Sequence, residues 1–339
     1  MAKHYYRPLA QTGPVRPEGA LPLAGGWAWF TQAERLSRDA APKIVEAPDI
    51  PPDILQAITE PRASQAGLSM DRPRLMAILN ATPDSFSDGG QFHGADAAIA
   101  QARALIGAGA DLLDIGGEST RPGAETVPED QESARVLPVI RAIRAESQVA
   151  ISVDTRKAAV ADAALAAGAN LINDVSALTF DPALAPLVAG HAVPVCLMHA
   201  KGDPATMQND PRYDNVVLDV YDALAARIAS AEQAGIARQR IIVDPGIGFG
   251  KTLEHNLALL RNITLFHGLG VPILLGVSRK RFIGTIGDAP DPQARMPGSV
   301  ALALFGVTQG VQITRIHDMA ETKQALRLFE AVTFGTSDT

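Results

Sequence analysis

The 339-residue sequence has little of what several classes of protein require. It contains one cysteine, Cys196, so an intrachain disulfide is excluded and the chain suits a reducing compartment. Cys196 lies in an apolar run, which favours a buried hydrophobe over a nucleophile. Aromatic residues make up only 5% of the chain. A core built from Ala, Leu, Val and Ile favours parallel strands with covering helices over a β-sandwich.

Excess positive charge and long hydrophobic runs are also missing. The formal net charge of −7 gives no electrostatic reason to bind nucleic acid or an anionic membrane. No segment approaches the roughly 18 apolar residues that span a bilayer, and the opening MAKHYYRPLAQTGP has no signal-peptide core. We therefore expect a cytoplasmic protein without nucleic-acid or membrane partners. An anionic substrate would need a local cluster of cations.

The chain consists of two successive regions that differ in proline content and in hydrophobic pattern. Residues 1–73 hold ten of the 24 prolines and show no sustained apolar period. This predicts a loosely structured extension, with a short helix near 32–38, and a downstream domain that folds and works without it. From Arg74, short apolar runs alternate with longer amphipathic, Ala-rich segments.

The alternation predicts eight β-then-α units over residues 74–335. Strands are expected at 75–80, 112–116, 150–154, 171–175, 194–199, 241–244, 272–276 and 312–317. Helices are expected at 94–109, 129–145, 157–167, 216–234, 253–266, 299–308 and 319–332. Eight such units in about 260 residues indicate an α/β fold of the (β/α)8 TIM-barrel type. An open, doubly wound sheet remains the alternative, because the pattern cannot show closure.

Every predicted strand ends in polar residues, and in a barrel these ends meet at one mouth. The ends carry Asn80, Asp114 with Glu118, Asp154, Asn173, His199, Asp244, Ser278-Arg279-Lys280, and Arg315 with His317. One group, Asp154, Asn173, Asp244 and Lys280, suits a flat, uncharged heterocycle that has adjacent N–H donors and a carbonyl. A second group, Thr120, Arg121, Arg315 and His317, suits phosphate or pyrophosphate.

The stretch DPGIGFGKT at 244–252 resembles a nucleotide loop without being one. A Walker loop needs Gly at the position that Pro245 occupies, and proline has no N–H to offer a phosphate. The glycines run G-x-G-x-G, which also fails the dinucleotide fingerprint. We expect Asp244 to bind the heterocycle and the glycines to let the backbone turn tightly beside it. His199 has no second His or Cys at ligand spacing, which favours a structural role.

Eight stretches, taken in order, resemble the dihydropteroate synthase family. They are ILNATPDSFSDGG at 78–90, DIGGESTRPG at 114–123, SVDT at 152–155, INDV at 172–175, LMHAKGDPATMQ at 197–208, DPGIGFGK at 244–251, GVSRKRFIG at 276–284 and RIHD at 315–318. The resemblance covers residues from about 74 to about 330. It implies a transferase of folate biosynthesis that joins 6-hydroxymethyl-7,8-dihydropterin pyrophosphate to p-aminobenzoate by an SN1-like displacement, giving 7,8-dihydropteroate and pyrophosphate.

The resemblance also implies roles for particular residues. Asp154, Asn173, Asp244 and Lys280 would hold the pterin, with Met198 and Phe249 against its ring. Arg121, Arg315 and His317 would hold the pyrophosphate, and Asn80 would help bind Mg²⁺. The p-aminobenzoate pocket would use Phe86, Asp88, Thr120 and Pro122, with Ser278 and Arg281 near the carboxylate. Asn80, Arg121, Lys280, Arg315 and His317 would carry the catalysis, in a homodimer packed through the late barrel helices.

Two other functions stay open for this sequence. A corrinoid-dependent methyltetrahydrofolate methyltransferase could use the same barrel and the same pterin group. It would have no need of Arg121, Arg315 and His317 around a pyrophosphate, and all three are present. A non-catalytic pterin-binding homologue would be expected to lack loop residues such as Asp84, Phe86 or Asp88, and the sequence retains them.

Overall fold

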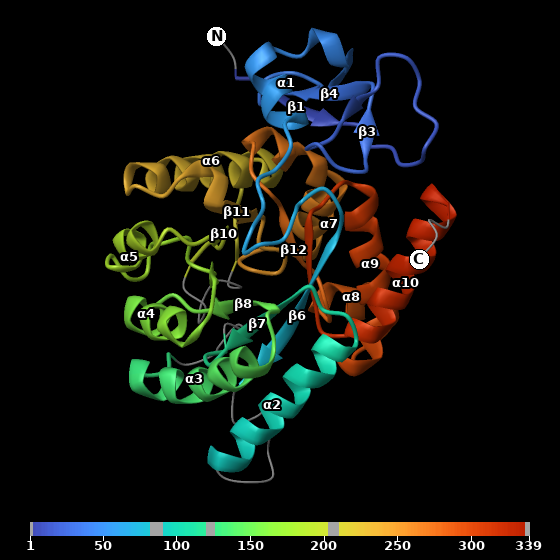
Figure 1. Cartoon of the computed structure of the whole chain (residues 1–339). Coiled ribbons are helices and arrows are strands. Elements are labelled where there is room, and N and C mark those ends of the chain that lie inside the picture. The colour runs from blue at the N-terminus through green and yellow to red at the C-terminus, as the bar shows by residue number, and fades with distance from the viewer. Residues whose placement is uncertain (1–2, 82–90, 120–125, 203–209, 336–339) are drawn as a thin grey trace.

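The chain folds around an eight-stranded parallel sheet (Figure 1). The computed structural model describes residues 3–81, 91–119, 126–202 and 210–335. The strands are β6 (Arg74–Asn80), β7 (Leu112–Gly116), β8 (Ala150–Asp154), β9 (Leu171–Asp174), β10 (Val195–Met198), β11 (Ile241–Asp244), β12 (Leu274–Gly276) and β13 (Ile313–Ile316). They pair in the order β11-β10-β9-β8-β7-β6-β13-β12, and a parallel bridge between Val243 and Ile273 joins the two end strands. The predicted TIM barrel is therefore confirmed.

Helices follow the strands and cover the outside of the barrel (Figure 1). They are α2 (Gln91–Gly107), α3 (Glu129–Glu146), α4 (Ala158–Ala167), α5 (Leu184–His191), α6 (Val216–Gln233), α7 (Leu253–Arg261), α8 (Arg281–Ile286), α9 (Met296–Thr308) and α10 (Met319–Phe334). The sequence did not predict α5 and α8, which are too short to show a clear helical period. The predicted helix at 253–266 ends at Arg261, and a 3-10 segment, η4 (Ile263–Leu269), continues it.

Inward-facing residues form an apolar layer at the amino ends of the strands. Its members are Met76, Leu112, Ala150, Leu171, Cys196, Ile242, Leu274 and Ile313, one from each strand, and all are buried. Met70 packs against this layer from the segment before β6 and closes that end of the barrel. Cys196 belongs to the layer, as its apolar run predicted. The opposite end, where the strands finish, remains for polar residues.

The extension is ordered, which differs from the loosely structured segment expected from its prolines. It contains β1 (Tyr5–Pro8), β2 (Leu21–Pro22), β3 (Trp29–Phe30), β4 (Gln32–Leu36), β5 (Lys43–Glu46), η1 (Ala47–Asp49) and α1 (Pro52–Thr59). Strands β1, β4 and β5 form an antiparallel sheet, so the segment near 32–38 is a strand and not the expected helix. Its prolines occupy strand ends, turns and the first turn of α1, where they cost no helical hydrogen bond. Leu23, Phe30 and Ile58 build a small core of its own.

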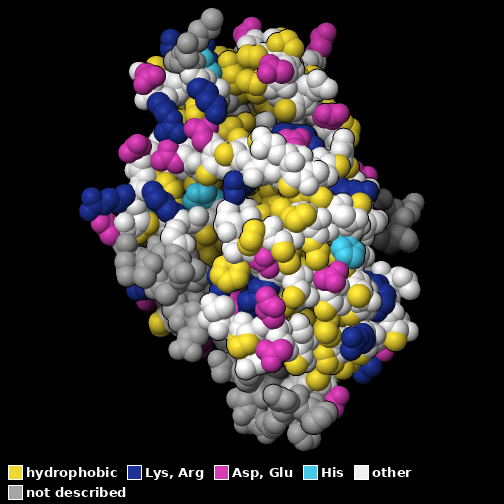
Figure 2. Space-filling model, turned by 90° about the vertical axis from the view of Figure 1, so that its left-hand side faces the viewer, with side chains coloured by type: hydrophobic (Ala, Val, Ile, Leu, Met, Phe, Trp, Pro, Cys, Tyr) yellow, Lys and Arg dark blue, Asp and Glu magenta, His cyan; other side chains and the backbone are white. Residues whose placement is uncertain are grey.

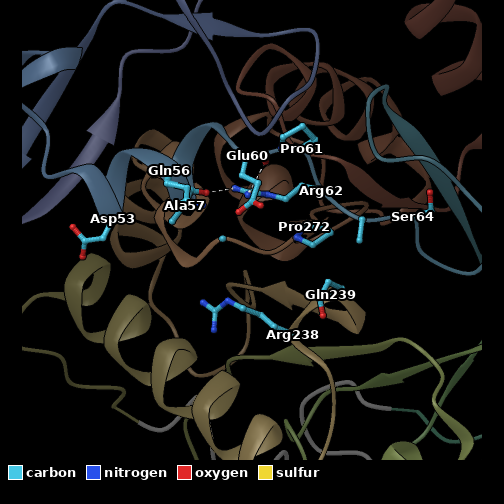
Figure 3. A pocket seen from close by; sticks show the side chains of 12 residues that line it. Asp53, Gln56, Ala57, Glu60, Pro61, Arg62, Ser64, Arg238, Gln239 and Pro272 are labelled. Carbon is cyan, nitrogen blue, oxygen red and sulfur yellow. Dashed lines mark hydrogen bonds between the residues drawn. The ribbon is translucent and has the colours of Figure 1, made fainter.

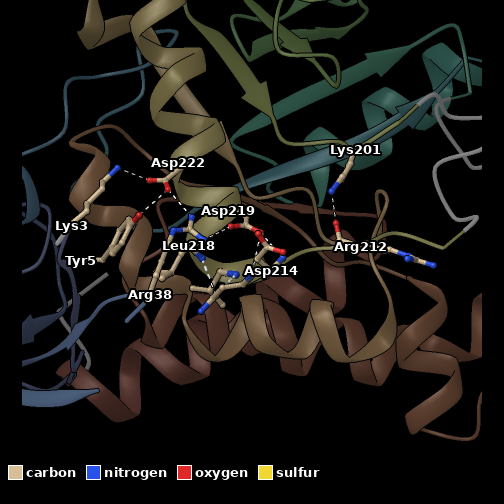
Figure 4. Close-up of polar contacts among 11 residues, drawn as sticks. Lys3, Tyr5, Arg38, Lys201, Arg212, Asp214, Leu218, Asp219 and Asp222 are labelled. Atoms are coloured by element: carbon tan, nitrogen blue, oxygen red, sulfur yellow. Dashed lines mark hydrogen bonds and ion pairs between the residues drawn. The ribbon is translucent and has the colours of Figure 1, made fainter. Parts of the chain in front are cut away.

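The extension is docked on the barrel through polar and aromatic contacts. The Trp27 indole N–H donates to the Val307 carbonyl in α9 at 2.8 Å, and Arg62 donates to the His267 carbonyl at 2.9 Å. On α6, Asp222 accepts from Lys3 and from the Tyr5 hydroxyl, at 2.6 and 2.8 Å (Figure 4). These contacts tie both ends of the extension to elements that lie late in the chain.

A cavity of about 540 Å³ lies where the extension meets the amino end of the barrel (Figure 3). Asp53, Glu60 and Arg62 line it from the extension, and Arg238 and Pro272 line it from the barrel. It lies beside the amino ends of β11 and β12, whereas the polar strand ends are on the other side of the sheet. Because its lining carries both signs of charge, the cavity indicates no particular ligand.

On the face shown in Figure 2, basic and acidic side chains are interspersed and form no extended patch of one sign. None of the helices within the described ranges is long and apolar enough to cross a membrane.

Removing the extension is expected to destabilise the barrel, contrary to what the sequence alone predicted. Deletion of residues 1–60 would expose the surfaces around Val307 and Tyr221 that Trp27 and Tyr5 cover. We expect the midpoint of thermal unfolding, followed by circular dichroism, to fall by about 10 °C. Trp27→Phe, which removes the indole N–H and one ring of the indole but keeps an aromatic side chain, serves as the mild control. An unchanged midpoint in the deletion would show that docking contributes no stability.

Candidate active site

The alternation of the barrel strands places a polar layer directly above the apolar one. Side chains two residues apart in a strand share a face, so the residue two positions after each inward apolar residue also points inward. In seven strands these positions are Asp114, Ser152, Asn173, Met198, Asp244, Gly276 and Arg315. One step further, Asn80, Gly116 and Asp154 are aligned by the register of β6, β7 and β8. The carboxyl end of the barrel therefore collects the predicted residues of the heterocycle group.

Arg315 is at the centre of this layer. Its Nε donates to Asp114 Oδ2 at 2.5 Å, and its Nη2 donates to Asp154 Oδ2 at 2.8 Å. Asn173 Nδ2 donates to the same Asp114 oxygen at 3.0 Å. One cation thus bridges two buried carboxylates. The sequence assigned Arg315 to an anion-binding group separate from Asp154, and the structure shows that Arg315 is in direct contact with Asp154 of the heterocycle group.

Both carboxylates keep a buried oxygen for which the described residues provide no partner, Oδ1 of Asp114 and Oδ1 of Asp154. Burial and the neighbouring Asp114 charge raise the pKa of Asp154 to about 7, while Arg315 acts in the opposite direction. Gly116 stands beside Asp154, where a Cβ would lie 3.4 Å from the Asp154 side chain. Unpaired buried acceptors are costly. The site therefore suits a ligand that brings N–H donors to these oxygens.

Asp244 ends β11 and controls the turn that follows it. Its Oδ1 accepts the Gly246 N–H at 2.7 Å, and burial raises its pKa above the usual range. Gly246 has φ +68°, and a Cβ there would lie 1.8 Å from the His199 carbonyl oxygen. The turn therefore requires glycine at this position, as predicted. One Asp244 oxygen is used inside the protein, and the carboxylate stays fixed in orientation.

Lys251 stabilises this same turn from within. Its Nζ donates to the carbonyls of Gly246 and Phe249, both at 2.9 Å, and lies 3.0 Å from His199 Nδ1. Burial lowers the pKa of Lys251 to about 7 and the pKa of His199 to about 3. His199 is therefore neutral at pH 7 and packed against Lys251, which supports the structural role predicted for it. The likeness of Lys251 to a Walker lysine has no structural basis.

Lys280 and Phe249 face one another across the mouth of the barrel. The Lys280 Nζ lies 4.1 Å from the centroid of the Phe249 ring. Burial lowers the pKa of Lys280 to about 8, against the opposing charge of Asp244. Gly248 leaves room for the Lys280 side chain, because a Cβ at position 248 would lie 3.1 Å from Lys280 Cδ. A planar ligand next to this pair would meet an aromatic ring and a cation.

Ser278 and His317 lie together where β12 and β13 end. The Ser278 hydroxyl accepts the His317 backbone N–H at 3.1 Å and lies 3.0 Å from His317 Nδ1. Arg281, expected near the carboxylate of p-aminobenzoate, is exposed at the first position of α8. Its neighbour Arg279 pairs instead with Asp318, which directly follows His317. Arg279 and Asp318 therefore fix the relative position of the two strand ends.

Several predicted site residues lie outside the described residues. They are Phe86, Asp88, Thr120, Arg121 and Pro122. Asn80, predicted to bind Mg²⁺, ends β6 half-buried and is aligned with Gly116 in the next strand. Within the described ranges, no three His, Cys, Asp or Glu side chains are grouped to hold a metal ion. Near the end of β6 the structure thus provides one side-chain amide oxygen, that of Asn80, as a ligand for Mg²⁺.

Sequence reasoning gave no role to Asp114 and Ser152. Asp114 is fully buried, holds Arg315 and Asn173, and comes from the middle of β7. The signal that would have found both residues is their parity: each lies two positions after an inward apolar residue, Leu112 or Ala150. The sequence placed Asp114 among the polar strand ends but could not identify the residues that it contacts.

Comparison with known proteins places the whole site in one family. Residues 76–317 match the family described as pterin binding enzymes. The dihydropteroate synthase of Escherichia coli K12 is 45% identical over 269 residues, which cover 79% of this chain and 95% of that protein.

Solved structures agree with the sequence comparison. The dihydropteroate synthase of Xanthomonas albilineans with 4-aminobenzoic acid has a TM-score of 0.76 and 48% identity, covering 80% of this chain and 98% of that one. The same enzyme in complex with 7,8-dihydropteroate has a TM-score of 0.73 and 46% identity, covering 80% and 98%. The chain belongs to the dihydropteroate synthase family of pterin-binding enzymes.

Proposed function

We propose that the protein condenses 6-hydroxymethyl-7,8-dihydropterin pyrophosphate with p-aminobenzoate, forming 7,8-dihydropteroate and releasing pyrophosphate. The observation that carries this proposal is the group of polar side chains at the carboxyl end of the barrel, where Asp154, Asn173 and Asp244 are buried and Lys280 lies near the charges of Asp244 and Asp154. Its buried acceptors match the N–H groups of a pterin, and its cation matches the pterin carbonyl. Met198 lies in the same layer and would pack against the ring.

The reaction needs positioning and charge stabilisation more than proton transfer. The amine nitrogen of p-aminobenzoate attacks the pterin methylene, the bond from that carbon to the pyrophosphate oxygen breaks, and the amine loses one proton. In an SN1-like path positive charge builds on the dihydropterin. Asp114 and Asp154 together carry more negative charge than Arg315 offsets, so they would stabilise that charge from a buried position. His199, with its lowered pKa, supplies no base.

The pyrophosphate side of the site is assigned to His317, Arg315 and Arg121. His317 lies at the mouth next to Ser278, and the Arg315 side chain is 21% exposed. Asn80 fits a magnesium ion only with substrate phosphate oxygens and water as further ligands, an arrangement typical of Mg²⁺. Bound there, the ion would offset the charge of the leaving pyrophosphate. We also propose that the protein forms a homodimer and is located in the cytoplasm.

One assay tests the proposed function directly. The purified protein is mixed with the pterin pyrophosphate, p-aminobenzoate and Mg²⁺, and pyrophosphate release is followed together with formation of dihydropteroate. Release that requires both organic substrates supports the proposal. Pterin binding without turnover would favour a non-catalytic homologue instead.

Affinity for a pterin ligand is expected to fall as the pH drops below 7. Asp154 has a pKa of about 7 in the free protein and accepts the ligand N–H groups best as a carboxylate. Protonation therefore competes with binding, and the dissociation constant rises by up to about tenfold for each pH unit below 7. Calorimetry with 7,8-dihydropteroate between pH 5.5 and 8.5 measures this, with Asp154→Asn as the control that lacks the Asp154 contribution. A flat profile in the unmodified protein would remove Asp154 from ligand binding.

A further inference from the structure

The turn that follows β11 depends on other side chains for its conformation. It comprises residues 245–250, PGIGFG, which we call the glycine turn. Its three glycines, Gly246, Gly248 and Gly250, have positive φ angles of 68°, 84° and 61°. Glycine loses more backbone freedom on folding than any other residue, so such a turn is not fixed by its own sequence. The restraints come from the side chains packed around it.

Lys251 supplies several of these restraints from a buried position. Its Nζ donates to the carbonyls of Gly246 and Phe249 and lies 3.3 Å from the His199 carbonyl oxygen. The side chain is 3% exposed, and the partners that the described residues provide for it are backbone carbonyls and the neutral His199 ring. A buried cation with such partners ties segments of chain together and does not form an ion pair.

Two other side chains hold the middle and the end of the glycine turn. Tyr213, which precedes α6, donates its hydroxyl to the Gly250 carbonyl at 2.9 Å. Its ring packs edge-on against His255, with the ring centroids 5.0 Å apart. Asn256 in α7 accepts the Gly248 N–H at 2.7 Å. Elements on two sides of the turn therefore restrain it.

The conformation of the glycine turn determines where three groups of the pterin site lie. Asp244 directly precedes the turn and accepts the Gly246 N–H at 2.7 Å. Phe249 belongs to the turn, and the Lys280 Nζ lies 4.1 Å from the centroid of its ring. Gly248 is close to the stem of Lys280, since a Cβ there would lie 3.1 Å from Lys280 Cδ. A shift of the turn would move all three groups.

We propose that Lys251 and Tyr213 are positioning residues for pterin binding, which act by holding the glycine turn in the conformation that orients Asp244 and Phe249. This inference rests on the proposed function for the identity of the ligand. The donors of both residues are directed to the backbone of the turn. Both residues therefore act through the turn and need no contact with the ligand.

The first test uses Lys251→Met, which keeps a long, unbranched side chain but removes every donor. We expect the dissociation constant of 7,8-dihydropteroate, measured by calorimetry, to rise at least about tenfold, because the carbonyls of the turn lose their donor. Arg62→Met is the matched control. Arg62 is also a buried cation that donates to backbone carbonyls, those of Ala57, Glu60 and His267, but it lies at the amino end of the barrel. Its loss should lower the melting temperature and leave the affinity unchanged.

A second variant separates position from charge. The charge of Lys251 also lowers the pKa of Asp244, so Lys251→Met changes the electrostatics of the site as well as the turn. Tyr213→Phe removes one hydroxyl and no charge. We expect it to raise the dissociation constant about threefold, as loss of one hydrogen bond does. Tyr5→Phe, which removes the hydroxyl that donates to Asp222, is its control and should bind normally.

Two results of these titrations would overturn the proposal. An unchanged dissociation constant in folded Tyr213→Phe would assign the effect of Lys251 to its charge. A loss of affinity in Arg62→Met as large as that in Lys251→Met would assign it to general destabilisation.

Hydrogen exchange tests the restraint without any ligand. The Phe249 N–H donates to the Gly246 carbonyl at 3.1 Å, an acceptor that Lys251 also holds. The Gly248 and Phe249 amides should therefore exchange at least about tenfold faster in Lys251→Met, while amides of β7 keep their rates. Unchanged exchange would overturn the positioning role even in an enzyme that binds the pterin normally. An unmodified protein that releases no pyrophosphate would contradict the proposed function alone, because exchange rates and pterin titrations still decide this inference.

Discussion

Asp244→Asn is expected to lower the affinity for a pterin by at least about a hundredfold, equivalent to about 2.7 kcal/mol. The carboxylate has one oxygen committed to the Gly246 N–H at 2.7 Å. An asparagine that keeps this bond through its oxygen turns its NH₂ group towards the N–H donors of the ligand. If the amide flips, the NH₂ group meets the Gly246 N–H and the turn loses its anchor. Neither orientation satisfies both sides, whereas the carboxylate does.

The measurement is calorimetric titration of 7,8-dihydropteroate, with thermal unfolding recorded for the same samples. Asp181→Asn is the matched control, because Asp181 also accepts backbone N–H groups, from Ala158 at 2.7 Å and Ala183 at 2.9 Å, but lies outside the site. The control should bind normally. Affinity within a few-fold of normal in Asp244→Asn would remove Asp244 from pterin recognition.

Arg315→Ala is expected to weaken both the pterin and pyrophosphate and also to destabilise the fold. Removal of the cation leaves the side chains of Asp114 and Asp154, 0% and 7% exposed, without a countercharge. Breaking a buried pair in this way costs roughly 3–5 kcal/mol. The melting temperature should therefore fall by about 10 °C. Ligand affinities are measured for free pterin and for pyrophosphate with Mg²⁺.

Two companion variants show which contact is responsible. Arg315→Lys keeps the charge but cannot bridge both carboxylates, so we expect it to recover stability more than affinity. Asp114→Asn combined with Arg315→Ala removes one of the two buried negative charges left without a countercharge and should recover part of the melting temperature. If Arg315→Ala weakened pyrophosphate alone, the division into separate heterocycle and anion groups drawn from the sequence would be right.

The barrel could be predicted because its signals are local. Each strand is a short apolar run with a polar end, as in IIVD of β11, and each long helix shows its own period. The same locality explains why Asp154, Asn173, Asp244 and Lys280 could be grouped before the structure: strand ends of one barrel must converge. Features that depend on the residues of a single strand could therefore be predicted from the sequence.

Contacts between distant segments could not be predicted in this way. Arg315 meets Asp114 and Asp154 across 201 and 161 residues, and no local pattern joins them. The order of the extension has a similar origin. Its strands are two to five residues long, and Phe30 and Ile58 become a core only when β3 and α1 come together. The amino-acid composition indicated many prolines, but it could not show the strand pairing that accommodates them.

The docking of the extension also has a consequence for the order in which the protein is synthesised. The acceptor of the Trp27 indole N–H, the Val307 carbonyl, lies 280 residues later in the chain. Asp222, which accepts from Tyr5, lies 217 residues after it, and His267, which accepts from Arg62, lies 205 residues after it. At ribosomal rates of about 5–20 residues per second, the Val307 carbonyl is made about 15–60 s after the indole. The extension is thus synthesised before the barrel but can dock only after α9 has been made, so its attachment marks a barrel whose carboxyl-terminal half is nearly complete.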